Sequence, residues 1–169
     1  MKRGFTLIEL LVTITIIGVL AALITANLSD ARARARDAKI KQNLVQLKTA
    51  LRLYYNDYQT YPATGNGLVF NACGDEGITA CTPDGAFSAG AGPTIYMNQL
   101  VKSGTYFEFK YYPCNSGESF RAKVTLENPS DPDLAASQAR CPTATCVCPG
   151  PPAIPCLSYS ATDYLVCAD

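Results

Sequence analysis

The chain has 169 residues, a length that predicts one small domain together with an anchor. Its 14 basic side chains balance its 14 acidic ones, so the formal net charge is zero. Histidine is absent, which removes the usual general base and the commonest nitrogen ligand of metals and so disfavours most enzyme classes.

The charge is unevenly spread along the chain. Residues 27–58 carry seven basic and three acidic side chains, whereas residues 59–169 carry five basic and ten acidic ones. The first of these segments is therefore basic and the C-terminal part is acidic.

An apolar run from Phe5 to Ala26 follows two basic residues and a glycine. At ~1.5 Å per residue, a helix of this length spans ~33 Å, which is enough to cross the hydrocarbon core of a bilayer. Hydroxyl groups in such a run can return to the helix's own carbonyls and then cost little in lipid. The run contains four threonines: Thr6, Thr13, Thr15 and Thr25.

Glu9 is the single charged side chain of this apolar run. A carboxylate within a membrane span costs roughly 2.5–3.5 kcal/mol on insertion scales. An isolated anchor has no reason to keep such a group, whereas a helix that meets a positively charged partner does. The simpler interpretation is that Glu9 lies close enough to the start of the helix to reach water at the lipid headgroups.

The segment GFTLIEL at residues 4–10 resembles the cleavage and methylation motif of type IV prepilins and of the related pseudopilins of type II secretion. The resemblance implies that a membrane peptidase cuts between Gly4 and Phe5 and that Phe5 is then N-methylated. It also implies that the Glu9 carboxylate pairs with the free amino group of Phe5 on a neighbouring subunit. Cleavage would thus create the cation that a buried acid needs.

Two ordinary alternatives explain residues 1–26 less well. A secretory signal peptide has a shorter apolar region, roughly 7–15 residues, and an A-x-A-like cleavage site that Ile24-Thr25-Ala26 matches poorly. A simple single-pass anchor would explain the hydrophobicity but would leave Gly4, Phe5 and Glu9 to coincidence.

The orientation signals conflict. Lys2 and Arg3 place the N-terminus in the cytoplasm by the positive-inside rule, but three arginines after the run argue the opposite way. The cysteines favour a head outside the cytoplasm, because disulfides need an oxidising compartment. The arginines concerned are Arg32, Arg34 and Arg36.

These arginines lie in an alanine-rich segment between Asp30 and Lys41 that favours helix. In an isolated subunit we expect this segment to be solvated. In a filament it is a candidate for the region where neighbouring helices approach closely and opposite charges meet. A third interpretation is that the arginines bind phosphates of nucleic acid. Each step of two residues turns a helix by ~200°, however, so the arginines are spread around its axis and do not form one row.

The absence of proline before Pro62 predicts one long helix from Phe5 to Tyr58 and an irregular head after it. Pilins often carry a proline several residues after a glycine in the position of Gly18. Ala26 occupies that place here, so we expect the helix to stay continuous in a filament. Apolar residues at steps of four and three predict a face on which the head packs: Ile40, Leu44, Leu47, Leu51, Tyr54 and Tyr58.

The end of this helix also resembles the pilin pattern. Paired tyrosines at Tyr54 and Tyr55 precede Tyr61-Pro62 and then Gly67-Leu68. We interpret the tyrosines as aromatic side chains that fix the head to the helix, with carbohydrate binding as the alternative.

In the head, residues 63–105 are predicted to be mostly loop, with a short helix near residues 95–101. β-forming residues at 106–112 and 119–127, separated by a turn at 115–117, predict an antiparallel hairpin on the apolar face of the helix. A last strand is predicted at 163–167, and residues 128–158 are predicted to form a proline-rich connection. These elements predict an α+β fold, and the resemblance implies the type IV pilin-like arrangement of one long helix packed against a small antiparallel sheet. The predicted divisions are a leader (1–4), the membrane-spanning half of the helix (5–26), its amphipathic half (27–60) and a disulfide-bonded head (61–169).

All eight cysteines lie in the head, as expected of a disulfide set in an oxidising compartment, and Cys73 with Cys81 is the easiest local pair. A four-cysteine zinc site in the proline-rich connection is the rival interpretation, but its spacings fit poorly. The cysteines are Cys73, Cys81, Cys114, Cys141, Cys146, Cys148, Cys156 and Cys167.

No cofactor is predicted, apart from a weak case for calcium. Asp131, Asp133 and Asp163 could supply oxygen ligands, but calcium needs roughly six to eight, so a solvated loop is the favoured interpretation.

The sequence thus predicts a structural filament subunit rather than an enzyme. The resemblance implies a homo-oligomeric helical filament, with a prepilin peptidase and methyltransferase, an inner-membrane assembly platform and minor pilins as partners. It also implies a single-pass membrane protein before assembly and a surface pilus afterwards. A pseudopilin of a type II secretion or DNA-uptake apparatus is the alternative, and a membrane-tethered enzyme is a remote one.

Overall fold

The computed structural model describes residues 5–64, 71–74, 78–82, 84–90, 94–100, 109–141 and 159–168, with residues 25–27 described by their backbone alone. Internal contacts divide the chain into two compact units, Met1–Arg36 and Asp37–Asp169. The predicted leader, residues 1–4, and the predicted glycine–leucine turn at residues 67–68 lie outside the described residues.

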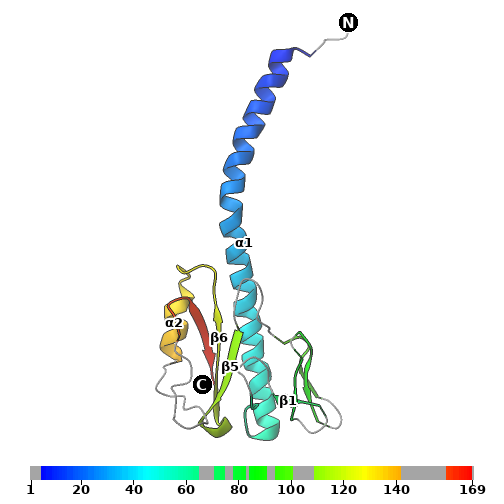
Figure 1. The fold of residues 1–169 in the computed structure, drawn as a ribbon, viewed down its shortest axis with the longest axis vertical. Coiled ribbons are helices and arrows are strands. Elements are labelled where there is room, and N and C mark those ends of the chain that lie inside the picture. Colours follow the sequence, from blue (N-terminus) through cyan, green and yellow to red (C-terminus); the bar gives the residue numbers. More distant parts are fainter. Residues whose placement is uncertain are drawn as a thin grey trace. The chain divides into compact units, whose positions relative to one another are not determined.

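The predicted long helix is confirmed as α1, Leu7–Tyr58, and it passes through Gly18 and Ala26 without interruption (Figure 1). Its N-terminal part is apolar on every side. An 18-residue window there reaches a mean hydropathy of 2.7, and none of it is buried. By length and composition, this helix could cross a membrane.

Within the second unit, the predicted apolar face of α1 forms the floor of the hydrophobic core. Ile40, Leu44, Leu47, Leu51 and Tyr54 are all buried, as the spacing of four and three requires. Tyr58, the last residue of the predicted stripe, remains 38% exposed at the C-terminal end of the helix.

A three-stranded antiparallel sheet covers this face. It consists of β5 (Phe109–Cys114), β6 (Ser119–Thr125) and β7 (Asp163–Cys167) in the order β5-β6-β7. The predicted last strand is therefore confirmed, and so is the predicted hairpin over its described part, since residues 106–108 of its first strand lie outside the described residues. Its core-facing side chains join those of α1 in one cluster: Phe109, Tyr111, Phe120, Ala122, Val124, Tyr164 and Val166.

Within the described part of residues 63–105, two small hairpins interrupt the segment that was predicted to be mostly loop. β1 (Asn71–Cys73) pairs with β2 (Thr79–Ala80), and β3 (Phe87–Ala89) pairs with β4 (Thr94–Met97). The short helix predicted near residues 95–101 is wrong, because its first part is β4. The β-branched and aromatic residues of β4 favour a strand, and its partner strand buries Phe87 in the core.

A short helix, α2 (Asp133–Arg140), lies within the segment that was predicted to be an irregular connection. Its acidic residue in the first turn and its basic residue in the last turn suit the helix dipole. Leu134 and Ser137 are buried three residues apart on one face. Figure 1 shows α2 beside β7, at the edge of the three-stranded sheet.

The C-terminal end of α1 carries a strained residue that gives a stability prediction. Gln59 has a φ of 55°, the left-handed conformation that glycine adopts more readily, while its backbone N–H donates to the Tyr55 carbonyl at 2.7 Å. We expect Gln59→Gly to raise the free energy of unfolding by about 1 kcal/mol, because the left-handed strain is removed. Chemical denaturation measures this change.

Gln59→Ala is the matched control. It also removes the side-chain hydrogen bond from Gln59 Nε2 to the Asn56 carbonyl, which is 3.0 Å long, but it keeps the strained backbone. The alanine variant should therefore show no gain. Equal stability of the glycine and alanine variants would show that φ strain is not the cause.

Candidate functional site

The first turn of α1 places Glu9 against Thr6. The Thr6 backbone N–H donates to Glu9 Oε2 at 2.9 Å, and the Thr6 hydroxyl donates to the same oxygen at 2.6 Å. In return, the Glu9 backbone N–H donates to Thr6 Oγ1 at 3.3 Å. Because α1 begins at Leu7, Thr6 is the N-cap residue and Glu9 the third helical residue, which is the geometry of a capping box.

This arrangement gives Glu9 partners within its own chain. Two donors of Thr6 satisfy one carboxylate oxygen, and the helix N-terminus favours negative charge in its first turn. The prediction that the Thr6 hydroxyl returns to a helix carbonyl is wrong, because Thr6 precedes α1 and no helix carbonyl lies N-terminal to it; its hydroxyl donates to Glu9 instead. The T-x-x-E spacing in the sequence could have indicated this cap.

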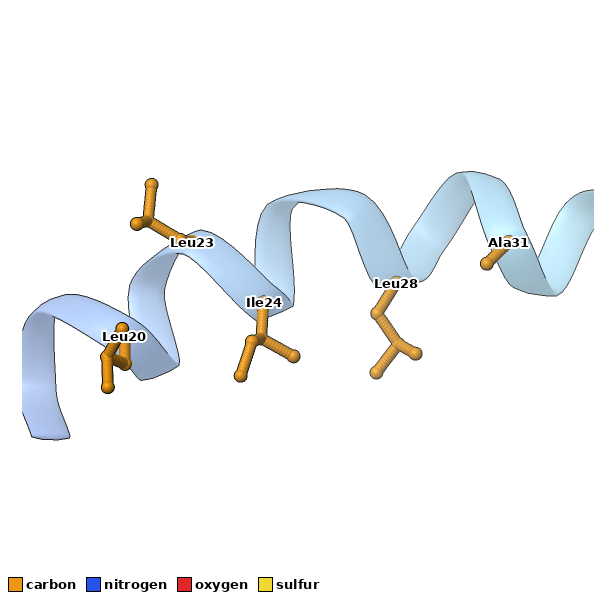
Figure 2. A pocket seen from close by; sticks show the side chains of 5 residues that line it. All are labelled: Leu20, Leu23, Ile24, Leu28 and Ala31. Atoms are coloured by element: carbon orange, nitrogen blue, oxygen red, sulfur yellow. The ribbon is translucent and has the colours of Figure 1, made fainter.

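The remainder of the first unit offers an apolar helix surface that is not covered by other described residues. Figure 2 shows the side chains of Leu20, Leu23, Ile24 and Leu28, which line one shallow hollow on the surface of the helix. Each of these side chains is at least 40% exposed. The surface therefore requires hydrocarbon or other apolar helices around it.

Two other threonines of this helix behave as the sequence predicts. The Thr13 hydroxyl donates to the Leu10 carbonyl at 2.8 Å, and the Thr15 hydroxyl donates to the Leu11 carbonyl. Their hydroxyl groups are therefore satisfied within the helix, which lowers the cost of placing them in lipid.

In the second unit, α1 holds the connection between β6 and α2 through buried charge. Asp37, only 3% exposed, accepts the backbone N–H groups of Glu127 and Asn128, each at 2.9 Å. One turn later, Lys41 Nζ donates to both oxygens of Asp131, at 3.0 and 2.9 Å, and to Asp133 Oδ2 at 2.7 Å. These contacts fix the connection to the helix.

The three aspartates that were weak candidates for calcium ligands therefore form ion pairs with lysines. Asp131 and Asp133 bind Lys41, and Asp163 binds Lys123 Nζ at 2.8 Å. Within the residues that the structure describes, no group of three or more His, Cys, Asp or Glu side chains is placed to hold a metal. The favoured prediction, a solvated loop, is wrong for Asp131, because this side chain forms a partly buried ion pair.

Asp163 is a buried anion with several donors. Besides Lys123, it accepts the Thr125 hydroxyl at 2.7 Å and the Ser160 backbone N–H at 2.8 Å. Burial works to raise the pKa of the Asp163 carboxyl, but these hydrogen bonds outweigh it, so the pKa lies below its ordinary value. For Asp131, burial likewise opposes the shift, and the bonds from Lys41 lower the pKa.

These two shifts predict how the stability of the head depends on pH. A carboxyl whose pKa is lower in the folded state contributes stability above its unfolded pKa and loses it as pH falls through the folded value. We therefore expect the unfolding midpoint to be level at neutral pH and to fall below about pH 4, where unfolded aspartates take up protons. Thermal unfolding followed by circular dichroism over a pH series measures this.

Asp163→Asn and Asp131→Asn serve as the comparison variants. Each is less stable at neutral pH, and each should lose less on acidification than the unchanged chain. An unfolding midpoint that does not move between neutral and acidic pH would contradict the lowered pKa values of Asp131 and Asp163.

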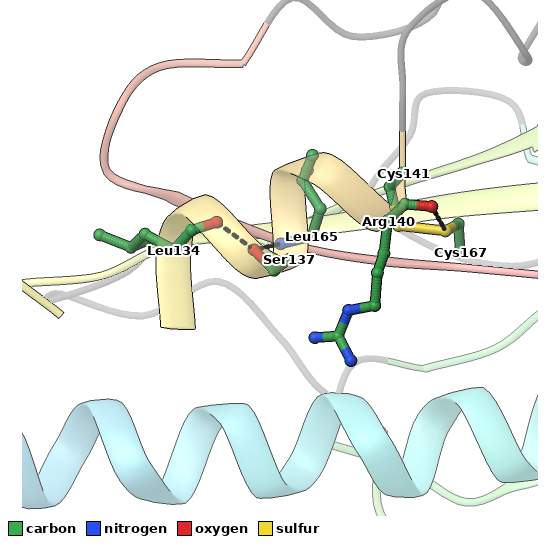
Figure 3. The surroundings of a disulfide bond; sticks show 6 residues. All are labelled: Leu134, Ser137, Arg140, Cys141, Leu165 and Cys167. Atoms are coloured by element: carbon green, nitrogen blue, oxygen red, sulfur yellow. Dashed lines mark hydrogen bonds between the residues drawn. A yellow bond between two sulfur atoms is a disulfide. The ribbon is translucent and has the colours of Figure 1, made fainter. Parts of the chain in front are cut away.

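A disulfide fastens α2 to the last strand. Cys141 at the end of α2 is bonded to Cys167 at the end of β7 (Figure 3). Between them, the Ser137 hydroxyl donates to the Leu134 carbonyl at 2.8 Å and accepts the Leu165 N–H at 3.2 Å. The edge of β7 thus has a backbone donor satisfied by α2, which protects it from pairing with another chain.

The structure also contains the Cys73–Cys81 disulfide, the local pair named from the sequence, and Cys114 is disulfide-bonded as well. No cysteine is free in the described part of the chain. The four-cysteine zinc site is wrong, because one of its members, Cys141, is bonded to Cys167. Its other members, Cys146, Cys148 and Cys156, lie outside the described residues.

The tyrosines at the end of α1 join the helix to the head. The ring of Tyr54 stacks on Tyr58 with centroids 4.5 Å apart, and the ring of Tyr61 meets Phe120 edge-on at 4.8 Å. Tyr54 and Tyr61 are buried in the core. The structural interpretation of this cluster is therefore confirmed.

Comparison with known proteins supports the importance of the N-terminal region. The family described as the prokaryotic N-terminal methylation motif matches residues 1–25. No solved structure matches the chain significantly.

Curated relatives fall into two groups. Type II secretion system core protein G of Klebsiella pneumoniae is 45% identical over 67 residues, which is 40% of this chain and 48% of the relative. The protein of the same name in Escherichia coli K12 is 45% identical over 67 residues, 40% of this chain and 46% of that protein. The type IV major pilin protein PilA of Myxococcus xanthus is 38% identical over 69 residues, 41% of this chain and 31% of that pilin.

The chain thus spans about half the length of the core protein G relatives that it matches. Neither group is named as an enzyme. The predicted resemblance is confirmed: the chain carries the N-terminal methylation motif at residues 1–25 and is related both to type II secretion core protein G and to the type IV pilin PilA.

Proposed function

We propose that the chain is a structural subunit, a pilin, of a type IV pilus-like filament. In this account a prepilin peptidase removes residues 1–4 by cutting after Gly4, and Phe5 becomes an N-methylated N-terminus. Residues 5–26 form the membrane-spanning and later filament-core half of the helix, residues 27–60 its amphipathic half, and residues 61–169 the head outside the cytoplasm.

One observation carries the proposal most strongly. The apolar run from Phe5 to Ala26 contains a single acid, Glu9, and Thr6 donates two hydrogen bonds to its carboxylate. Desolvation of a carboxylate is tolerable when a cation pairs with it. The amino group of a processed neighbouring Phe5 is such a cation, and the match to the methylation motif supports its formation.

The second unit adds a further surface suited to assembly. On the side of α1 turned away from its buried face, Val45 is 54% exposed and Leu53 is 53% exposed. Large apolar side chains at such positions favour contact with another subunit. Continuity of the helix through Gly18 and Ala26 in the assembled filament stays a prediction.

A pseudopilin of a type II secretion or DNA-uptake apparatus is the second candidate. The identity to core protein G, 45% over 67 residues, is higher than the 38% over 69 residues to PilA, and this favours it. Both candidates share processing, the inner-membrane assembly platform and the helical filament, with minor pilins as further partners. They differ in the amount and length of fibre at the cell surface.

Electron microscopy of sheared surface fibres, with mass spectrometry of their N-terminus, tests the proposal. Abundant long fibres that contain this chain, beginning at N-methylated Phe5, are the result expected of a pilin. Short and scarce fibres with the same N-terminus would indicate the pseudopilin. Failure to find the chain in any filament would contradict both.

Gly4→Leu gives a prediction for processing. The bulkier residue at the cleavage position should leave the precursor intact, so the chain should begin at Met1 and should not enter fibres. Gly18→Leu is the matched control, because open space surrounds Gly18 within the described structure. Its N-terminus should be processed normally, and an intact precursor in both variants would point to general misfolding instead.

A further inference from the structure

Three arginines just beyond the apolar run have no part in the proposed assembly contact. Arg32, Arg34 and Arg36 belong to the first unit, and the first two are exposed. Among the described residues, no ion pair involves Arg32 or Arg34. On the head side of a membrane span, such a cluster opposes the usual distribution of positive charge, so its presence needs a cause.

Their distance from the apolar segment is set by the helix. At ~1.5 Å per residue, the backbone of Arg32 lies ~9 Å and that of Arg34 ~12 Å beyond Ala26, where the apolar run ends. The polar layer of a bilayer leaflet is about 5–8 Å deep, the difference between the hydrocarbon thickness and the whole. Arginine side chains are long and tilt toward the N-terminus of a helix, so both guanidinium groups can reach back to lipid phosphates when the apolar run spans the bilayer.

Their distribution around the helix favours lipid over other anionic partners. Steps of two residues turn by ~200°, so successive arginines lie on nearly opposite sides of α1. Lipid headgroups surround a spanning helix completely and can meet guanidinium groups on both sides. A nucleic-acid duplex or a single protein surface lies along one side and would meet only part of the set.

We propose that Arg32 and Arg34 bind the phosphate groups of anionic phospholipids in the unassembled subunit. A guanidinium group suits phosphate because it donates two parallel hydrogen bonds as well as charge. The contact would fix the depth of the helix at the membrane surface. This inference depends on the membrane insertion in the proposed function, but not on filament formation.

The test uses the full chain in vesicles of phosphatidylcholine with a minor fraction of phosphatidylglycerol. Spin-labelled forms of the two lipids report which is immobilised at the protein. We expect a clear preference for phosphatidylglycerol that falls about fivefold for each arginine removed, so that Arg32→Gln with Arg34→Gln nearly abolishes it. High salt should weaken the preference of the unchanged chain.

Lys39→Gln with Arg140→Gln is the charge-matched control, since both side chains are exposed and lie outside the first unit. It should retain most of the preference. Insertion with no preference for phosphatidylglycerol would overturn this inference and leave the filament proposal standing, as would arginine-dependent binding of duplex DNA without lipid preference. Failure to insert into phosphatidylcholine vesicles would overturn the membrane anchor and this inference together.

Discussion

Glu9→Gln is expected to abolish incorporation of this chain into filaments, even though it preserves the first turn of α1. Glutamine at the third helical position still accepts a hydrogen bond from the N-cap backbone, so the capping box can survive. What the substitution removes is the negative charge. In our account that charge pairs with the amino group of Phe5 on the neighbouring subunit, so the loss of incorporation should approach that of Glu9→Leu.

The comparison of these variants separates two roles of Glu9. If the side chain served only as a helix cap, Glu9→Gln would assemble normally and Glu9→Leu would lose stability of the helix start. Thr13→Val is a control that removes a hydroxyl from the same helix without changing its charge. Quantifying this chain in sheared fibres, relative to its amount in the membrane, measures all three.

The largest effect on the stability of the head is expected from Asp163→Ala. Asp163 is 2% exposed and accepts Lys123 Nζ, the Thr125 hydroxyl and the Ser160 N–H. Removing the carboxylate deprives a buried ammonium of its counter-ion, and breaking a buried pair in this way costs about 3–5 kcal/mol. The free energy of unfolding in urea, measured on the detergent-solubilised chain, reports the loss.

Two further variants make this prediction specific. Lys123→Met with Asp163→Leu removes both charges and should recover most of the stability, because an apolar pair avoids the cost of desolvation. Asp133→Ala removes a carboxylate that is 58% exposed and should cost less than about 1 kcal/mol. Similar losses for Asp133→Ala and Asp163→Ala would show that burial of the pair is not what matters.

The long helix and the main sheet could be predicted because local signals determine them. Proline is absent before Pro62, and the stripe from Ile40 to Tyr54 has the helical period. The β-forming residues of β6 and β7 marked both strands. These features depend on residues near one another in the sequence, so they are visible without the fold.

The features that the sequence did not predict depend on residues that are far apart in the chain. α2 has eight residues, too few for a helix that is stable by itself, and its packing on β7 and the Cys141–Cys167 bond hold it. Eight cysteines allow 105 pairings, so no local rule selects this one. The ion pair of Lys41 with Asp131 joins residues 90 positions apart, which only the tertiary structure brings together.

For the N-terminal site, the sequence indicated Glu9 as the decisive residue but missed its partner Thr6. The energetic cost of an acid in an apolar run predicted a cation from another subunit as its partner. The T-x-x-E spacing was the available signal for the internal cap, and the structure shows that cap. In our account, Glu9 therefore exchanges contacts with Thr6 for the neighbour's amino group on assembly.

A density map of the assembled filament at side-chain resolution would show whether Glu9 pairs with the N-terminus of a neighbouring subunit. We expect each subunit to begin at Phe5 and the Glu9 carboxylate to lie ~3 Å from the amino nitrogen of Phe5 in an adjoining copy. Density for residues 1–4, or a Glu9 carboxylate bonded only to Thr6 of its own chain, would contradict it.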